Sequence, residues 1–204
     1  MNILCFGDSN TFGTSPVDGK RLAENERWPS LLGIKLGAGY QVIEAGQPNR
    51  TLVNDPPFSG DKSGIKYLKP YLEKYSLDVI IIQLGTNDLK ARFDLTAEQI
   101  AQGLKKLLFE VEHFYINSRA PKCIVISPLK VYEVSQYQRI YAGAEIKSDQ
   151  LVPHFAEIAK LHQCHFLDVY SQVNPHSGEG IHLAPDAHNS LAEHVASLFN
   201  LNSG

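Results

Sequence analysis

The chain has 204 residues, of which 43% are apolar and 20% charged, and its formal net charge is −3 at pH 7. This length and composition predict one soluble globular domain spanning residues 1–204. General nucleic-acid binding is not expected, because the chain has no surplus of cations to displace the counterions of a phosphate backbone. Membrane insertion is not expected either, since no apolar run approaches the roughly 20 residues of a membrane helix.

The N-terminus and the cysteines favour a cytoplasmic protein. No basic segment followed by a long apolar run and a cleavage site stands at the N-terminus, where the first strand is expected to start at Asn2. Cys5, Cys123 and Cys164 are odd in number and lie in or beside apolar runs, which is typical of buried free thiols in a reducing compartment. No C-x-x-C or His-rich spacing suggests a zinc site, so no metal is expected.

Apolar runs alternate with helical patterns along the chain. Strands are predicted at Ile3–Phe6, Gln41–Glu44, Val79–Leu84, Cys123–Ser127 and His165–Asp168. Helices are predicted at Trp28–Leu36, Thr96–Ser118, Ala144–His162 and Ala184–Leu198. This alternation predicts an α/β fold, a three-layer α/β/α sandwich around a parallel sheet. Five strands fit the flavodoxin-like order 2-1-3-4-5.

Several residues support the predicted helix starts. Pro29 and Pro185 stand where a first helical turn accepts proline, and Thr96 with Gln99 has the spacing of a capping box. Pro153 predicts either a kink or a helix start. Two loops are expected: Asn54–Gly64, rich in Pro, Gly, Ser and Asp, and Pro128–Gly143. The second holds Tyr132, Tyr137 and Tyr141, and it is interpreted either as a loop beside a functional site or as a plain surface excursion.

Three backbone or amide donors are expected to meet at one edge of the predicted sheet. Ser9 leaves the first strand and Asn87 the third, and these strands are neighbours in the order 2-1-3-4-5. Gly46 follows the second strand, and a glycine lets its N–H approach a ligand closely. The N–H groups of Ser9 and Gly46, together with the Asn87 side-chain amide, therefore predict an oxyanion hole. The structural alternatives are that Ser9 only caps a helix and that Asn87 only serves a turn.

A base for Ser9 is expected in the loop before the last helix. His182 lies there, and Glu179, three residues earlier, can reach its Nδ1–H through a turn at Gly180. A carboxylate in that place fixes the tautomer in which Nε2 accepts the serine proton. Ser9, His182 and Glu179 are therefore predicted as catalytic residues, with Asp186 as the alternative acid.

Other polar and aromatic side chains are interpreted as structural residues or as candidate pocket residues. Arg50 is interpreted as pairing with a carboxylate near the crevice, and His188 as a structural residue near solvent or the last helix. Phe12, Trp28 and Phe93 could line an acyl or aryl pocket, although a core role is as well supported.

Several sequence blocks together resemble the GDSL or SGNH hydrolases, in particular their arylesterase and acyltransferase branch. The blocks are Gly7-Asp8-Ser9, Gly46, Gly85-Thr86-Asn87-Asp88 and Glu179-Gly180-Ile181-His182, with Arg27-Trp28 and Ala120-Pro121-Lys122 as further details. The chain departs from the family at two positions, where Asn10 replaces the frequent Leu and Glu179 replaces the usual Asp. The resemblance implies a three-layer fold and hydrolysis of small acyl esters through an acyl-serine.

The sequence thus predicts a serine esterase without metal or organic cofactor, acting on small-molecule esters of short acyl chains. Water resolves the acyl-enzyme, and acyl transfer to an alcohol is left open, as is homo-oligomer formation. Alternatives within the family are a carbohydrate O-deacetylase, a thioesterase and a lysophospholipase. A non-catalytic acyl- or sugar-binding module is an alternative of another class. A flavodoxin-like FMN carrier is a further one, although Asp8 would stand close to the phosphate.

Overall fold

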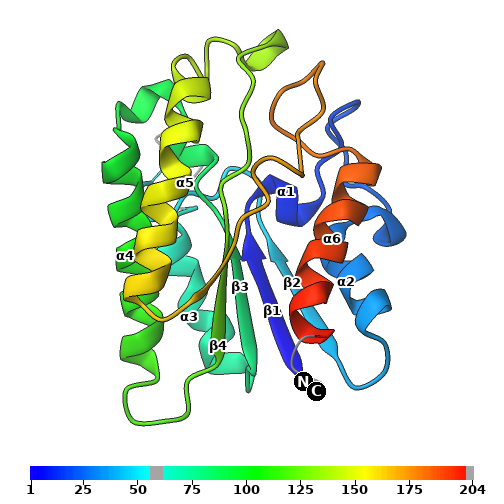
Figure 1. Cartoon of the computed structure of the whole chain (residues 1–204), viewed down its shortest axis with the longest axis vertical. Helices are drawn as coiled ribbons and strands as arrows, with labels where there is room; N and C mark the ends of the chain where they lie inside the picture. Colours follow the sequence, from blue (N-terminus) through cyan, green and yellow to red (C-terminus); the bar gives the residue numbers. More distant parts are fainter. Residues whose placement is uncertain (56–61, 201–204) are drawn as a thin grey trace.

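The computed structural model describes residues 1–55 and 62–200 and shows a five-stranded parallel sheet between two helical layers (Figure 1). The strand order is β2-β1-β3-β4-β5, which confirms the predicted fold class and order. All five predicted strands are present, with ends shifted by two residues or fewer. They are β1 (Asn2–Gly7), β2 (Gln41–Gly46), β3 (Val79–Gln83), β4 (Lys122–Ile126) and β5 (His165–Leu167).

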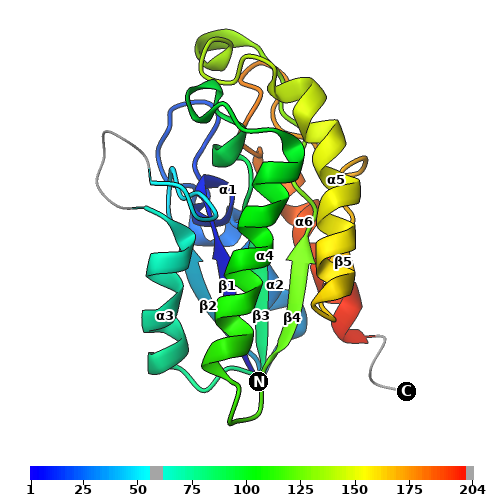
Figure 2. The same ribbon diagram turned by 90° about the vertical axis from the view of Figure 1, so that its left-hand side faces the viewer.

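The helices divide between the two faces of the sheet, as Figures 1 and 2 show from two sides. One face is covered by α3 (Gly64–Lys74), α4 (Ala97–Phe114) and α5 (Ala144–Leu161). The other is covered by α2 (Trp28–Leu36) and α6 (Pro185–Asn200).

Strand β1 contributes side chains to both hydrophobic cores, because successive side chains point to opposite faces of a strand. Leu4 and Phe6 belong to the core under α3, α4 and α5, whereas Ile3 and Cys5 belong to the core under α2 and α6. A strand covered on both faces needs apolar residues at every position, which explains the unbroken apolar runs of β1 and β3.

The predicted start of α4 is confirmed by its capping residues, whereas other predicted helix boundaries differ from the structure. Thr96 and Gln99 form the expected capping box at the start of α4, but the helix ends at Phe114 rather than Ser118. Pro153 lies inside α5, which begins at Ala144, so it does not mark a helix start. Helix α3 was not predicted, because Pro70 in its interior obscures the one-turn spacing of its buried Leu68 and Leu72.

Other expectations have mixed outcomes. The predicted loop Asn54–Gly64 lies partly outside the described residues, and Gly64 already belongs to α3. The three cysteines are free, but only Cys5 is buried, while Cys123 and Cys164 are half-buried. Within residues 1–55 and 62–200, none of the helices has the length and apolar composition needed to cross a bilayer.

The register of the sheet brings the predicted site residues to one edge. Gly7 at the end of β1 pairs with Gly46 on one side and with Gln83 on the other. Ser9 and Asn87 therefore leave the sheet at the same end, in the crevice where open α/β sheets bind ligands.

Candidate functional site

Ser9 stands at the start of a four-residue helix, α1 (Ser9–Phe12), directly after β1. The helix cap is Asp8, whose carboxylate accepts a hydrogen bond from the Asn10 N–H at 2.9 Å, so the Ser9 hydroxyl is not used as a cap. Close packing holds this turn: a Cβ on Gly46 would lie 2.1 Å from the Phe12 nitrogen. Glycine is therefore required at the end of β2 for α1 to lie where it does.

The structure joins Ser9, His182 and Glu179 in one hydrogen-bonded chain. The Ser9 Oγ lies 3.0 Å from His182 Nε2, and Glu179 Oε1 lies 2.6 Å from His182 Nδ1. All three residues are buried. Asp186, the alternative acid, is exposed in the first turn of α6. The carboxylate within reach of His182 is therefore that of Glu179.

The longer side chain of glutamate is accommodated by its own loop. The second oxygen of Glu179 accepts hydrogen bonds from the Ile181 and His182 N–H groups, at 2.9 and 2.7 Å. The turn requires Gly180, which has φ +93° and where a Cβ would lie 2.3 Å from the Tyr132 carbonyl oxygen. Burial opposes ionisation of Glu179, but the hydrogen bonds and charge of His182 and the Ile181 N–H hold its pKa below the usual range. The carboxylate is thus kept charged.

Asn87 is held by partners on both ends of its amide. Its Nδ2 donates to the Arg50 carbonyl at 3.0 Å, and the Tyr141 hydroxyl donates to its Oδ1 at 3.4 Å. This pairing orients the amide nitrogen, whose second hydrogen remains for a ligand. Tyr141 was predicted only as part of a loop near the site.

Arg50 has a different partner from the one predicted. Its Nη1 donates to the carbonyl of Gly7 at 3.0 Å and also to that of Ala45, and its guanidinium lies 4.2 Å from the centre of the Phe6 ring. Arg50 thus joins the ends of β1 and β2 through backbone carbonyls rather than through a carboxylate. A buried guanidinium suits this role because it offers several donors in a fixed plane.

Asn10, which replaces the family's frequent Leu, links the Ser9 turn to the His182 loop. Its Nδ2 donates to the Ile181 carbonyl at 3.1 Å, and its Oδ1 accepts from the Leu183 N–H at 3.0 Å. The two bonds flank His182 in the chain and so fix its distance from Ser9. Sequence reasoning did not assign this role; the only signal was the departure from the family motif.

A cavity of about 510 Å³ opens beside Ser9 and His182. Its lining comes from five separate segments: Ser9, Thr14, Pro48, Asn49, Asn87, Lys90, Ala91, Arg92, Tyr137, Arg139, Ile140, Tyr141, Ile181 and His182. The predicted loop 128–143 therefore does lie beside the site. The Tyr137 and His182 ring centres are 5.9 Å apart with the planes at 71°, an edge-to-face contact.

The aromatic residues proposed as pocket or core fall outside this lining. Trp28 is fully buried in the core, and its indole N–H donates to the Gln83 side chain at 3.0 Å. Phe12 and Phe93 do not line the cavity. His188 is not near solvent: it is buried in α6 and accepts a hydrogen bond from the Trp28 N–H at 3.4 Å. Burial, and then the charges of His182 and Arg27, lower its pKa to about 4.

Two further buried carboxyl groups, Asp8 and Asp88, are the chain neighbours of Ser9 and Asn87. Burial raises the pKa of Asp8 to about 6, against the opposing Asn10 N–H and the charges of His182, Lys90 and Arg50. Burial likewise raises the pKa of Asp88 to about 7, although the Leu52 N–H and the Asn54 side chain donate to it. In the described part of the chain, no group of three or more His, Cys, Asp or Glu side chains is arranged to hold a metal ion.

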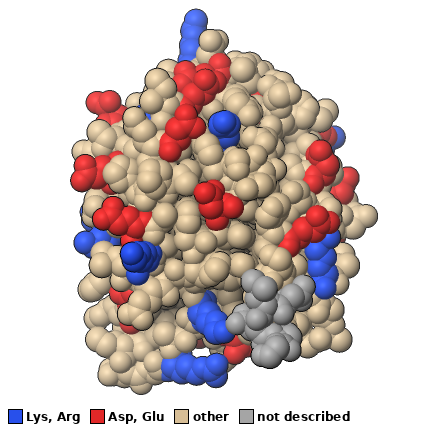
Figure 3. All heavy atoms as spheres, viewed as in Figure 1, with Lys and Arg blue, Asp and Glu red and all other residues tan. Residues whose placement is uncertain are grey.

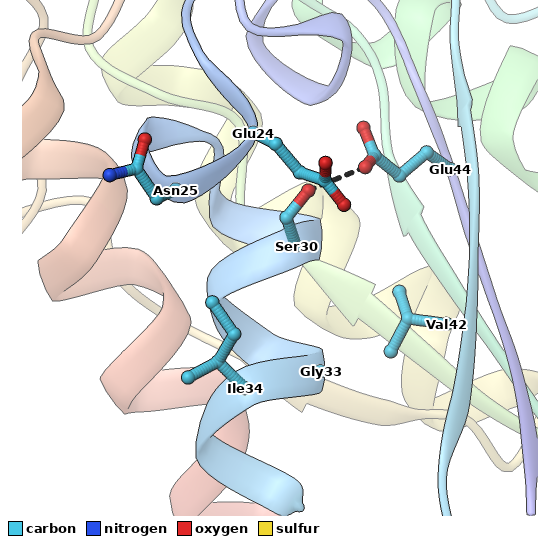
Figure 4. A pocket seen from close by; sticks show the side chains of 7 residues that line it. All are labelled: Glu24, Asn25, Ser30, Gly33, Ile34, Val42 and Glu44. Carbon is cyan, nitrogen blue, oxygen red and sulfur yellow. Dashed lines mark hydrogen bonds between the residues drawn. The ribbon is translucent and has the colours of Figure 1, made fainter.

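A second hollow, of about 520 Å³, lies between α2 and β2, and no histidine lines it (Figure 4). It is lined by Glu24, Asn25, Ser30, Gly33, Ile34, Val42 and Glu44. The Ser30 hydroxyl donates to Glu44 at 2.5 Å, and that carboxylate also accepts from Arg21 and Arg27. Ser30 and Glu44 are thus engaged with each other and with two arginines, which is typical of a structural cluster.

Comparisons with known proteins identify the family of this chain. A family model described as the GDSL-like lipase/acylhydrolase family matches residues 5–190. A carbohydrate acetylesterase from Sinorhizobium meliloti is 30% identical, with a TM-score of 0.93 and 98% of each chain covered. An aryl esterase from M. smegmatis is 34% identical, with a TM-score of 0.92 and the same coverage.

One curated relative is longer than this chain. An acetylxylan esterase from Xylanibacter ruminicola is 23% identical over 219 residues, which include 97% of this chain. The chain spans 42% of the length of that relative. The names of these relatives all describe hydrolases of carboxylic esters, so the predicted enzyme class is confirmed at the level of the family. The match over residues 5–190 shows that the chain belongs to the GDSL-like lipase/acylhydrolase family.

Proposed function

We propose that this protein is a serine esterase that hydrolyses small esters of short acyl chains through an acyl-serine intermediate. The observation that carries the proposal is the continuous hydrogen-bonded chain from Ser9 Oγ to His182 Nε2 at 3.0 Å and from His182 Nδ1 to Glu179 at 2.6 Å. A nucleophile, a base and an orienting carboxylate in this arrangement are what acyl transfer at a serine requires.

In the proposed mechanism, Ser9 Oγ attacks the acyl carbon as His182 Nε2 takes its proton. His182 then gives this proton to the departing alcohol, and water reverses the sequence to release the acid. Glu179 keeps the Nδ1–H oriented and stabilises the imidazolium. The N–H groups of Ser9 and Gly46 and the amide of Asn87 receive the oxyanion, and each such donor typically contributes about 3–4 kcal/mol in the transition state.

Acetyl and other short acyl groups are the proposed acyl part. Two relatives are named as acetylesterases, one of carbohydrates and one of xylan. The cavity beside Ser9 is lined by Lys90, Arg92 and Arg139 and by several polar side chains, which suits a short acyl group better than a long apolar chain. A carbohydrate O-deacetylase is therefore the second candidate function, since its substrates are acetyl esters too.

The test is a panel of p-nitrophenyl esters from acetyl to dodecanoyl, with wild type, Ser9→Ala and His182→Ala. We expect acetyl to butyryl esters to react fastest and either variant to lose at least about 10³-fold in kcat, because the members of such a unit act together. Retention of more than a tenth of the activity in either variant would contradict the assignment. Faster hydrolysis of the dodecanoyl ester would contradict the chain-length proposal, and binding without turnover would favour a binding module.

A further inference from the structure

The cavity beside Ser9 has a basic wall. Lys90, Arg92 and Arg139 all line it, whereas none of its lining residues is Asp or Glu. The chain as a whole is acidic, with a formal net charge of −3, so this cluster is a local feature. On the face seen in Figure 3, basic and acidic side chains are both scattered rather than gathered by sign.

Lys90 is the buried member of the wall. Its ammonium donates to Asn49 Oδ1 at 2.7 Å and lies 5.8 Å from the centre of the Tyr141 ring, whose hydroxyl in turn orients Asn87. Burial and then the charge of Arg92 lower the pKa of Lys90 to about 8, while Asp8 and Asp88 oppose that shift. Below pH 8 a positive charge therefore stands close to the proposed oxyanion hole, with donors left for a ligand.

The backbone segments that carry Arg92 and Arg139 are joined by a hydrogen bond beside the cavity. The Ala91 N–H donates to the Ile140 carbonyl at 2.8 Å, and each arginine is the chain neighbour of one of these two residues. The Arg92 guanidinium lies 4.9 Å from the Phe93 ring centre. Arg139 is exposed, and among residues 1–55 and 62–200 it is not part of any ion pair.

We propose that the preferred substrates carry a carboxylate, in their acyl or alcohol part, which lies against Lys90 and Arg139 while the ester lies at Ser9. This inference rests on the proposed esterase function. A guanidinium fork and an ammonium are the groups that bind carboxylates best, and the attraction is stronger at the buried Lys90 than at the exposed Arg139. A cleft lined by one sign of charge also raises the rate at which oppositely charged ligands arrive.

The test compares esters that differ in charge but little in shape. One pair is 4-acetoxybenzoate and 4-acetoxybenzamide, and the other is the mono-p-nitrophenyl ester of succinic acid and p-nitrophenyl butyrate. For wild type we expect kcat/KM to favour the anionic member of at least one pair by about tenfold or more in low salt, with a smaller preference in high salt.

Reversing the charge of one arginine in the cavity and of one outside it tests whether the preference arises at the cavity. Arg139→Glu should reduce the anionic-to-neutral ratio of kcat/KM by about tenfold or more, whereas Arg119→Glu, an identical change at an exposed residue before β4, should leave it near the wild-type value. Arg139 is exposed, so its replacement is compatible with folding. Lys90→Met should lower the ratio as well.

Each outcome decides the inference. No anionic preference in either pair, or an equal ratio in Arg139→Glu and Arg119→Glu, would overturn it while leaving the esterase proposal in place. Loss of all hydrolysis in wild type, p-nitrophenyl acetate included, would instead reject the proposed function and this inference with it.

Discussion

Buried carboxyl groups flank Ser9 on two sides, and their surroundings differ. On the His182 side, Glu179 accepts hydrogen bonds from the His182 ring and from two backbone N–H groups, and its pKa is lowered. On the Asn87 side, one Asp8 oxygen has no hydrogen-bond partner among the residues that the structure describes, and burial raises the pKa of Asp8 to about 6 and that of Asp88 to about 7. Asp8 and Asp88 are also more deeply buried than Glu179, so depth of burial and hydrogen-bond partners together decide which carboxyl group stays charged.

This difference separates the two sides in function. A carboxylate that must orient and stabilise an imidazolium has to be ionised at neutral pH, and only Glu179 meets that condition with a contact to His182. Asp8 and Asp88 hold backbone turns by accepting from the Asn10 and Leu52 N–H groups, and a carboxyl group can accept such a hydrogen bond in either protonation state. Variants on the two sides should therefore affect activity and stability to different extents.

The largest effect among the variants that probe this contrast is expected at Glu179. Glu179→Gln should reduce kcat by roughly 10³–10⁴-fold, because a neutral amide can force the wrong His182 tautomer and removes the charge. Glu179→Asp restores the family's usual residue and should stay within about tenfold of wild type, since the charge is kept close to its place. Steady-state kinetics on p-nitrophenyl acetate would measure both. Equal activities of all three proteins would place the acid elsewhere, with Asp186 the first residue to change.

The next effect is expected at the oxyanion hole. Asn87→Ala should lower kcat by roughly 10²–10³-fold with a smaller change in KM, as for a donor used mainly in the transition state. Tyr141→Phe, which removes only the hydrogen bond that orients the Asn87 amide, should lower kcat by several-fold. A change confined to KM in Asn87→Ala would make this residue a ground-state binding group instead.

Asn10 tests the link between the two loops. Asn10→Leu introduces the family's frequent residue but leaves the Ile181 carbonyl and the Leu183 N–H without their partner, at a cost of about 1–3 kcal/mol for each buried group. We expect a lower melting temperature and a kcat reduced about tenfold as His182 shifts relative to Ser9. Asn10→Asp keeps the acceptor for Leu183 and should be less impaired. Wild-type kinetics and stability in Asn10→Leu would show that the link has no effect.

The sequence was sufficient for the parts that depend on local pattern. The signals for the apolar run of residues 79–82, for the capping box at Thr96 and for the blocks around Ser9, Asn87 and His182 each lie within a few residues. The sheet order then brings the blocks together. The family resemblance added the expectation that the separate blocks form one site.

The parts that escaped prediction depend on contacts between distant segments. The Asn10 bonds to Ile181 and Leu183 span more than 170 positions, at a residue where the family motif itself is not followed. The carbonyl partners of Arg50 and the burial of His188 against Trp28 arise only once helices and strands are packed. Helix α3 was not predicted because Pro70 lies in its interior, and the packing of Leu68 and Leu72 into the core stabilises the helix despite that residue.

The smallest effect on activity, and a distinct effect on stability, is expected at Asp88. Its pKa in the folded protein is raised from 3.8 to about 7, so the folded state binds more protons than the unfolded state between these values. Stability contributed by this site is therefore lost as pH rises from about 4 to 7.

Asp88→Asn removes the titration but keeps an acceptor for the Leu52 N–H. The variant should thus gain stability relative to wild type across this range, by at most about 4 kcal/mol at pH 8. Taking the difference between the two proteins largely removes the contributions of Asp8 and His188, which titrate in both. Thermal unfolding at pH 4, 5, 6, 7 and 8 would measure this difference, while kcat at pH 7 should stay within about threefold of wild type, as expected for a residue that does not contact the ester. A constant difference in stability across the series would show that Asp88 remains ionised in the fold, and a large loss of kcat would add Asp88 to the groups needed for catalysis.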